Sequence, residues 1–172
     1  IRAALDSLPG GESILLYGEP WMGGGTNLEG GARPADKRAL DALHDRIGFF
    51  CDDTRDCIKG NVFDAANAGY VNGAPQHGYD VLHSVSAWRS GAHGFWPKRA
   101  GQVVQYVSAH DNYTLWDKLA AVARRGDYDC PDADLLAQNR MTAGIYLTCQ
   151  GLPFMQAGEE WGRTKHGDHN SY

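Results

Sequence analysis

The sequence predicts an α/β fold built on a parallel sheet, and three observations carry that prediction. Four short apolar runs bounded by Gly, Pro or polar residues are typical of strands covered on both faces, at 13–17, 47–51, 103–109 and 152–157. Longer amphipathic stretches lie between them. Each interval leaves room for a crossover helix, which a parallel pair of strands requires. The order β-α-β-α-β-α-β fits an open doubly wound sheet or a portion of a (β/α)8 barrel.

Helical periodicity predicts the first two connecting helices. The stretch 36–45 places its apolar residues on one side and its charges on the other. The stretch 80–89 spaces Val81, Val85 and Trp88 at i, i+4 and i+7 and stops before a glycine. Both patterns are typical of amphipathic helices.

Two further helices complete the alternation. The stretch 114–125 opens with the T-x-x-D capping pattern, formed by Thr114 and Asp117, and closes on two arginines and a glycine. The stretch 134–151 becomes apolar nearly all round in its second half and ends at Gly151. It therefore predicts a buried helix that leads into the last strand.

Composition bounds the class of protein. The chain has 172 residues, is 42% hydrophobic and 22% charged, and carries a net charge of −5, which predicts one compact globular unit. It has no cluster of Lys and Arg along the sequence, which argues against nucleic acid or an anionic membrane as partner.

No apolar run approaches the roughly 20 residues of a membrane span. The start at Ile1 has no leader features, so the sequence does not indicate a compartment. The four cysteines have no metal-site or disulfide-framework spacing.

Carboxylates follow all four predicted strands. The residues at these ends are Glu19 and Trp21, then Asp52, Asp53 and Arg55, then His110, Asp111 and Asn112, and finally Glu159 and Glu160. Like charges crowded on one rim repel one another and raise one another's pKa values, which a purely structural rim does not need. Enzymes that break glycosidic bonds use such a rim, because one carboxyl must hold a proton while another stays ionised.

Structural alternatives exist for several of these residues. Asp52 and Arg55 fit a structural ion pair as well as a substrate contact, and Trp21 fits plain packing. Glu159 and Glu160 fit a supporting role better than a direct one. The segment 166–169, His-Gly-Asp-His, contains three metal-ligand types but lacks further ligands at a recognised spacing, so we expect a solvated loop.

Four segments together resemble the type I pullulanases of glycoside hydrolase family 13, the α-amylase-type (β/α)8 barrels. "LLYGEPW" (15–21) is similar to the fifth-strand motif of that family, and "YVSAHDNYTLWDKL" (106–119) is similar to its seventh-strand motif. "FFCDDTRDCIKGNVFDA" (49–65) resembles the sixth-strand segment, and 147–172 resembles the eighth strand with the loop after it. The resemblance covers nearly the whole chain.

The resemblance implies a fold and a set of roles. It makes residues 1–172 the C-terminal half of a (β/α)8 barrel, strands five to eight with their helices, truncated at both ends. Glu19 would be the general acid and base, Asp111 the transition-state stabiliser, and the substrate-binding residues His110, Tyr17, Trp21, Asp52, Arg55 and Asn170. The nucleophile belongs to an R-x-D motif that ends the fourth strand of the family, and none of the four strands predicted here ends in that motif. No metal site is implied in this chain.

The same resemblance implies an activity and partners. The full protein would cleave α-1,6-glucosidic branch linkages in pullulan, amylopectin, starch, glycogen or limit dextrins, with retention of configuration. It would need no cofactor, although a structural calcium elsewhere in the full protein is compatible with the resemblance. The missing N-terminal half of the barrel would be a partner, whereas nucleic acid and membranes would not. Two alternatives stay open: a catalytically inactive glucan-binding relative, and an unrelated small open-sheet α/β protein.

Overall fold

The structure is a computed structural model that describes residues 1–21, 30–40, 42–124, 127–129 and 132–171. Residue 41 of the first predicted helix, the C-terminal end of the third and Cys130 lie outside the described residues. Among the residues described, no helix is both long and apolar enough to cross a bilayer.

Four parallel strands form one sheet, as the sequence predicts. They are β1 (Leu16–Gly18), β2 (Ile47–Phe50), β3 (Val103–Gln105) and β4 (Leu152–Pro153), and they lie side by side in sequence order. The strands are shorter than the apolar runs. Tyr106, Val107 and Ser108 follow the last paired residue of β3 and are nevertheless buried. The predicted run therefore indicates burial that extends beyond the residues paired in the sheet.

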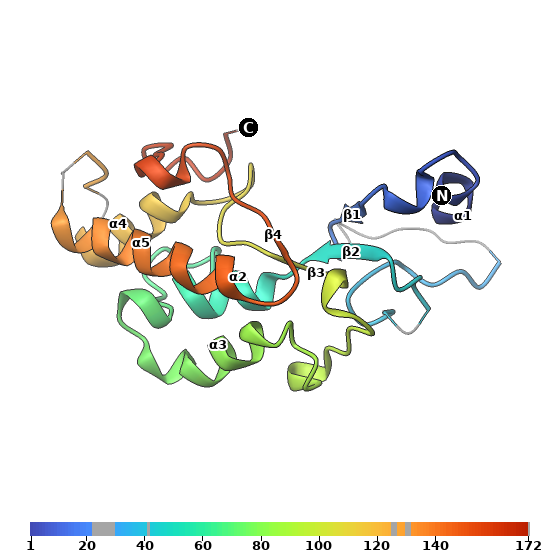
Figure 1. Cartoon of the computed structure of the whole chain (residues 1–172). Coiled ribbons are helices and arrows are strands. Elements are labelled where there is room, and N and C mark those ends of the chain that lie inside the picture. Colours follow the sequence, from blue (N-terminus) through green and yellow to red (C-terminus); the bar gives the residue numbers. More distant parts are fainter. Residues whose placement is uncertain (22–29, 41, 125–126, 130–131, 172) are drawn as a thin grey trace.

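Helices α2 (Asp52–Lys59), α3 (Gly78–Val85), α4 (Leu115–Arg124) and α5 (Ala133–Thr148) lie together at one end of the sheet, and the short α1 (Arg2–Asp6) lies with β1 at the other (Figure 1). The capping prediction for α4 is confirmed, because the Thr114 hydroxyl accepts a hydrogen bond from the Asp117 amide at 3.1 Å. Within the described ranges, six 3-10 turns accompany these elements: Gly11–Ser13, Tyr70–Asn72, Pro75–His77, Ala92–Gly94, Ala100–Gln102 and Glu159–Trp161.

The core lies where the helices meet the sheet. Phe49 of β2, Ile58 of α2, Leu119 of α4 and Tyr146 of α5 are all at most 3% exposed and belong to one apolar cluster. A polar chain crosses this core, in which the Trp88 indole N–H donates to the Thr54 hydroxyl at 2.8 Å. That hydroxyl in turn donates to the Gln105 side-chain oxygen at 2.7 Å, so helix α2 is bonded to strand β3 in the interior.

The predicted helix over 36–45 is wrong for the described residues 36–40 and 42–45, which form turns. The Asp36 carboxylate accepts the Arg38 amide at 2.9 Å, a local turn that competes with helix formation. Ala39 and Leu40 are nevertheless buried. The apolar pattern therefore indicates burial correctly and the backbone conformation incorrectly.

Two other helices differ from their predictions. Helix α3 ends at Val85, whereas the sequence predicts a helix over 80–89. Ala87 and Trp88 adopt left-handed φ values of 52° and 57°. Trp88 is 1% exposed, while Val85 is 46% exposed. Helix α5 is less buried than predicted, because three of its apolar side chains are exposed: Leu136, Met141 and Leu147. Helix α2 is not among the predicted helices, because the segment "DDTRDCIK" resembles the polar end of a strand.

The described cysteines are Cys51, Cys57 and Cys149, and all three are free and buried. Burial raises the pKa of Cys51 to about 12 and that of Cys149 to about 11. These thiols therefore stay protonated and pack as small apolar groups.

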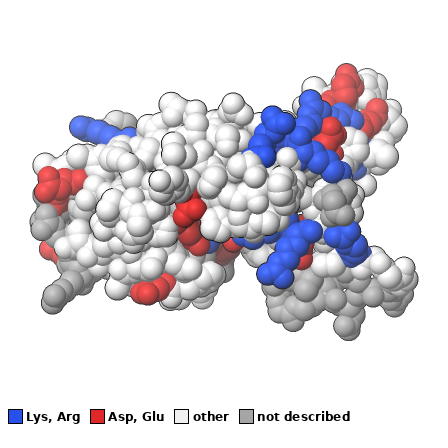
Figure 2. All heavy atoms as spheres, turned by 90° about the horizontal axis from the view of Figure 1, so that it is seen from below, with Lys and Arg blue, Asp and Glu red and all other residues white. Residues whose placement is uncertain are grey.

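Charge is distributed unevenly over the surface. On the face shown in Figure 2, basic side chains gather over the end that carries α1 and β1, whereas the surface over the helices is largely uncharged. Several basic side chains of the chain are in ion pairs, including Arg2 with Asp6 at 2.7 Å and Arg99 with Asp45 at 3.2 Å. The gathering is a product of the fold, because the sequence contains no run of Lys and Arg.

Candidate active site

A cavity of about 620 Å³ lies at the carboxyl ends of the strands. Residues that follow each strand line it, among them Glu19, Asp52, His110 and Phe154. Parallel strands place their carboxyl ends at one edge, which is where ligands bind in α/β proteins. The position of the cavity agrees with the expected site.

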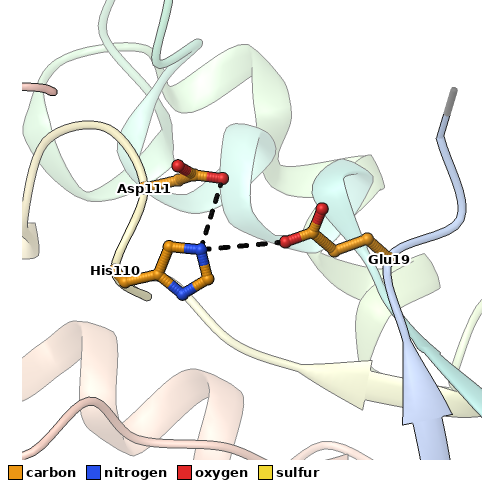
Figure 3. A group of neighbouring side chains, drawn as sticks. All are labelled: Glu19, His110 and Asp111. Atoms are coloured by element: carbon orange, nitrogen blue, oxygen red, sulfur yellow. Dashed lines mark ion pairs between the residues drawn. The ribbon is translucent and has the colours of Figure 1, made fainter. Parts of the chain in front are cut away.

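Glu19, His110 and Asp111 converge at the rim of this cavity (Figure 3). The His110 Nε2 atom lies 3.9 Å from Glu19 Oε1 and 3.7 Å from Asp111 Oδ2. The side chains are 43%, 62% and 38% exposed for Glu19, His110 and Asp111, so a ligand can reach all three. One oxygen of each carboxylate and the imidazole nitrogen lie within 4.8 Å of one another, a spacing that suits either the hydroxyls of one sugar or a divalent cation.

The turn that carries His110 and Asp111 is tightly held. Asn112 adopts a left-handed φ of 62°, and its amide donates to the His169 carbonyl at 3.0 Å. The next carbonyl, that of Tyr113, accepts from the Lys59 ammonium at 2.8 Å. Groups from α2 and the segment after β4 thus fix a turn that leads directly into α4.

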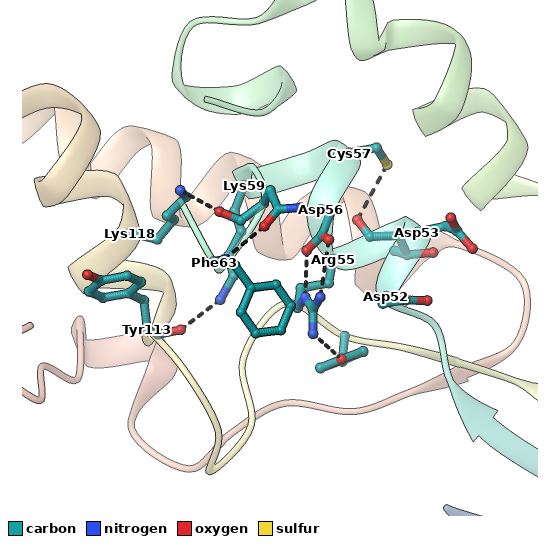
Figure 4. Close-up of polar contacts among 12 residues, drawn as sticks. Asp52, Asp53, Arg55, Asp56, Cys57, Lys59, Phe63, Tyr113 and Lys118 are labelled. Atoms are coloured by element: carbon teal, nitrogen blue, oxygen red, sulfur yellow. Dashed lines mark hydrogen bonds and ion pairs between the residues drawn. The ribbon is translucent and has the colours of Figure 1, made fainter. Parts of the chain in front are cut away.

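Lys59 and Lys118 are buried ammonium groups that bind backbone carbonyls (Figure 4). Lys59 lines the cavity, and burial lowers its pKa to about 7. Lys118 of α4 donates to the Asn61 carbonyl at 2.8 Å and to the Ala65 carbonyl at 3.3 Å. Together the two lysines join α2, α4 and the loop after α2 behind the site.

The Asp52 and Arg55 side chains line the cavity but have protein partners. The Lys37 ammonium donates to Asp52 at 2.8 Å and to Asp53 at 2.9 Å. Burial opposes the charge of Lys37, yet these two carboxylates raise its pKa overall. Arg55 donates to Asp56 at 2.6 Å and to the Tyr106 hydroxyl at 3.0 Å. Asp52 and Arg55 are therefore both in ion pairs, with Lys37 and Asp56 respectively and not with each other among the described ion pairs, and both side chains lie at the cavity wall.

The remaining candidate residues separate into two groups. Trp21 and Asn170 line the cavity, and Trp21 is 38% exposed. Tyr17 does not belong to the lining of that cavity, and its ring packs edge-on against Phe50 with centroids 5.7 Å apart. Phe50 also contacts Tyr106 and Phe154 edge-on, so an aromatic cluster forms the floor beneath the site.

Glu159, His166 and His169 follow the last strand, and each contacts a neighbouring side chain. Tyr146 donates to the Glu159 carboxylate at 2.6 Å, and burial raises the pKa of Glu159. His166 lies 3.2 Å from Asp129, an exposed pair. His169 is exposed, as expected of a solvated loop, and its ring lines the cavity and packs against the Tyr113 ring.

Nine residues of the cavity lining are not among the predicted site residues: Phe50, Lys59, Phe63, Tyr106, Val107, Ala109, Asn112, Phe154 and His169. Lys59 lies two helical turns after Asp52, so recognising α2 would have placed it near the site. The polar run of the seventh-strand motif signals Asn112. For Phe63 and His169 the sequence carries no comparable signal.

Comparison with known proteins gives the relationship. The chain is 36% identical over 164 residues to a pullulanase of Bacillus subtilis strain 168, which covers 92% of this chain and 21% of that protein. Over nearly its whole length the chain is therefore similar to a pullulanase. No protein-family model matches it. It spans about a fifth of the length of this pullulanase relative.

Solved pullulanase structures share the fold. The type I pullulanase of Bacillus subtilis, in complex with maltose, superposes with a TM-score of 0.80 at 32% identity and covers 94% of this chain and 22% of that one. The pullulanase of Paenibacillus barengoltzii, in complex with maltohexaose and α-cyclodextrin, superposes with a TM-score of 0.86 at 33% identity over 99% of this chain and 25% of that one. The resemblance expected from the motifs is confirmed.

Proposed function

We propose that this chain is the part of a debranching glycoside hydrolase that carries strands five to eight of an α-amylase-type (β/α)8 barrel. Three observations support the proposal: the similarity to pullulanases, the four parallel strands in sequence order, and the site at their carboxyl ends. Relatives of the chain are pullulanases, and solved ones hold maltose or maltohexaose. The substrates are accordingly α-1,6-branched glucans such as pullulan, starch and glycogen.

One observation carries the assignment of roles, namely the convergence of Glu19, His110 and Asp111 on one cavity. Glu19 donates a proton to the departing glycosidic oxygen and then accepts one from the attacking water. Asp111 stays ionised and stabilises the positive charge that develops at the anomeric carbon. His110, between the two carboxylates, donates to the hydroxyls of the bound sugar.

Other cavity residues hold the glucan. Trp21 offers an aromatic face for a sugar ring, and Asn170 offers an amide at the same wall. Asp52 and Arg55 shape the wall through their partners Lys37 and Tyr106. Tyr17 supports the floor through Phe50.

The nucleophile comes from the preceding half of the barrel. It attacks the anomeric carbon, forms a covalent glycosyl intermediate and releases the aglycone, after which water restores the carboxylate. This double displacement requires no redox or nucleotide cofactor. Since none of the four predicted strands ends in an R-x-D motif, we expect the 172-residue chain to release no maltotriose from pullulan by itself. Reproducible release by the purified chain would contradict this division of the site.

The assignment is tested in the longer protein that contains this chain. Glu19→Gln should lower kcat on pullulan by about 10²- to 10⁴-fold, because the proton donor is lost. Asp111→Asn should lower it by about 10²- to 10³-fold, because the stabilising charge is lost. Glu160→Gln is the matched control, since Glu160 is an exposed carboxylate outside the cavity lining. Full activity of Glu19→Gln would refute its role as the proton donor.

A further inference from the structure

Contacts from outside the turn support the backbone at 110–112. Asn112 has a φ of 62°, a left-handed conformation that Asn tolerates better than most residues with a side chain. Asp111 precedes it and His110 begins the turn, so the positions of both side chains depend on this backbone. Groups that bond to this backbone therefore bear on where both side chains lie.

Lys165 provides two of these contacts. Its ammonium donates to the His110 carbonyl at 3.0 Å and to the Asn112 carbonyl at 3.1 Å. The two carbonyls lie on either side of Asp111, so one cation holds the chain before and after that residue. Hydrogen bonds from a charged donor are stronger than neutral ones.

Lys165 is itself fixed by helix α4. The Asp117 carboxylate, which is 0% exposed, accepts the Lys165 amide at 2.9 Å and the Thr164 hydroxyl. Asp117 lies in the first turn of α4, which begins soon after the 110–112 turn. The turn leads directly into α4, the Asp117 carboxylate of α4 bonds to the Lys165 amide, and the Lys165 ammonium bonds back to the turn.

We propose that Lys165 is a positioning residue that sets the placement of the Asp111 carboxylate relative to His110 and Glu19. The catalytic part of this inference rests on the proposed function, whereas the structural part does not. Lys165 contacts backbone carbonyls and does not belong to the cavity lining, so it acts through the turn. A displacement of about 1 Å at a reacting group can lower a rate about 10²-fold, which makes a carbonyl contact of this kind relevant to turnover.

The structural part is tested by amide hydrogen exchange on the 172-residue chain carrying Lys165→Met. The Asn112 amide, bonded to the His169 carbonyl, should exchange at least about 10-fold faster, while the Cys51 amide, bonded to the Val104 carbonyl at 3.1 Å, keeps its rate. Lys98→Met is the matched control, because Lys98 also donates to a backbone carbonyl, that of Leu43, at 2.9 Å. An unchanged Asn112 rate, or equal acceleration at both amides, would overturn the inference.

The catalytic part is tested in the longer protein with pullulan. Lys165→Met should lower kcat about 10- to 100-fold and change KM less than about twofold, because the misplaced group acts in the transition state. Lys165→Arg, which keeps the charge and the donors, should recover most of the rate, and Lys98→Met should leave it unchanged. Full activity of Lys165→Met in an active enzyme would overturn the positioning role. A wild-type protein with no debranching activity would instead refute the proposed function and leave the exchange result standing.

Discussion

Strands β1 and β3 deliver the two halves of the candidate site from very different surroundings. All three residues of β3 are buried, and the residues that follow it up to Ser108 are buried as well. In β1, Leu16 is half-buried while Tyr17 and Gly18 are exposed, and Leu15 just before the strand is 67% exposed. Both strands are equally short, so length does not explain the difference.

The difference shows that the site joins a firmly packed element to a loosely packed one. The packed side carries His110 and Asp111 on a turn held by Lys59 and Lys165. On the loose side, Glu19 follows a strand that pairs with β2 alone among the described strands. The proposed function predicts that the uncovered surface of β1 meets the preceding half of the barrel, which would fix the position of Glu19 only in the complete enzyme.

The largest expected effect lies behind the packed side. Leu119 is fully buried in α4, so Leu119→Ala should lower the free energy of unfolding of the chain by about 2–5 kcal/mol through lost burial and a cavity. Urea denaturation measures this change. Leu82→Ala is the control, because Leu82 is 64% exposed on α3. Similar small losses for both variants would show that the core is not packed as described.

Next in size is the polar chain beneath β3. Thr54→Val keeps the shape and leaves the Trp88 N–H and the Gln105 side-chain oxygen without this partner, so we expect a loss of about 1–3 kcal/mol. Thr148→Val, at an exposed threonine of α5, removes a hydroxyl that bonds nearby carbonyls of its own helix. The comparison of the two urea midpoints is the measurement. A loss no larger than that of the control would contradict the role of the buried chain.

The buried ammonium of Lys59 gives the packed side a pH dependence. Burial lowers its pKa to about 7 from an ordinary 10.5, so between these values the unfolded chain binds more protons than the folded one. Stability supplied through this group therefore rises with pH from 7 towards 10.5, by at most about 1.4 kcal/mol per pH unit. Comparing the wild type with Lys59→Met from about pH 7.5 to about pH 9, values chosen within that window, isolates the effect, since other titrating groups cancel. A constant difference between them would show that Lys59 is not desolvated.

The smallest effect is expected on the loose side. Leu15→Ala should change the stability of the chain by less than about 0.5 kcal/mol, because the side chain is already 67% exposed. The same substitution in the longer protein should have a larger effect if the other half of the barrel covers β1. A thermal shift measured in both proteins decides this. Equal shifts would count against the covering of β1.

The sequence predicts the structure best where an apolar run is followed directly by polar residues that can act chemically. The parallel order of the strands follows from run length and spacing, and the pairing of Glu19 with Asp111 at one edge follows from that order. The helix predicted over 36–45 is wrong because local carboxylate turns and helices share the same apolar spacing. The roles of Lys59 and Lys165 cannot be predicted from the sequence, because they depend on carbonyls that lie 54 and 55 residues away along the chain.

The protonated, buried thiols of Cys51, Cys57 and Cys149 can report local unfolding of the protein. An alkylating reagent reacts with thiolates, so each of these sites is labelled only when its surroundings unfold. Cys51 follows β2 and Cys149 follows α5, and site-resolved mass spectrometry would separate them from Cys130. The order in which they become labelled would rank how readily each part of the protein comes apart.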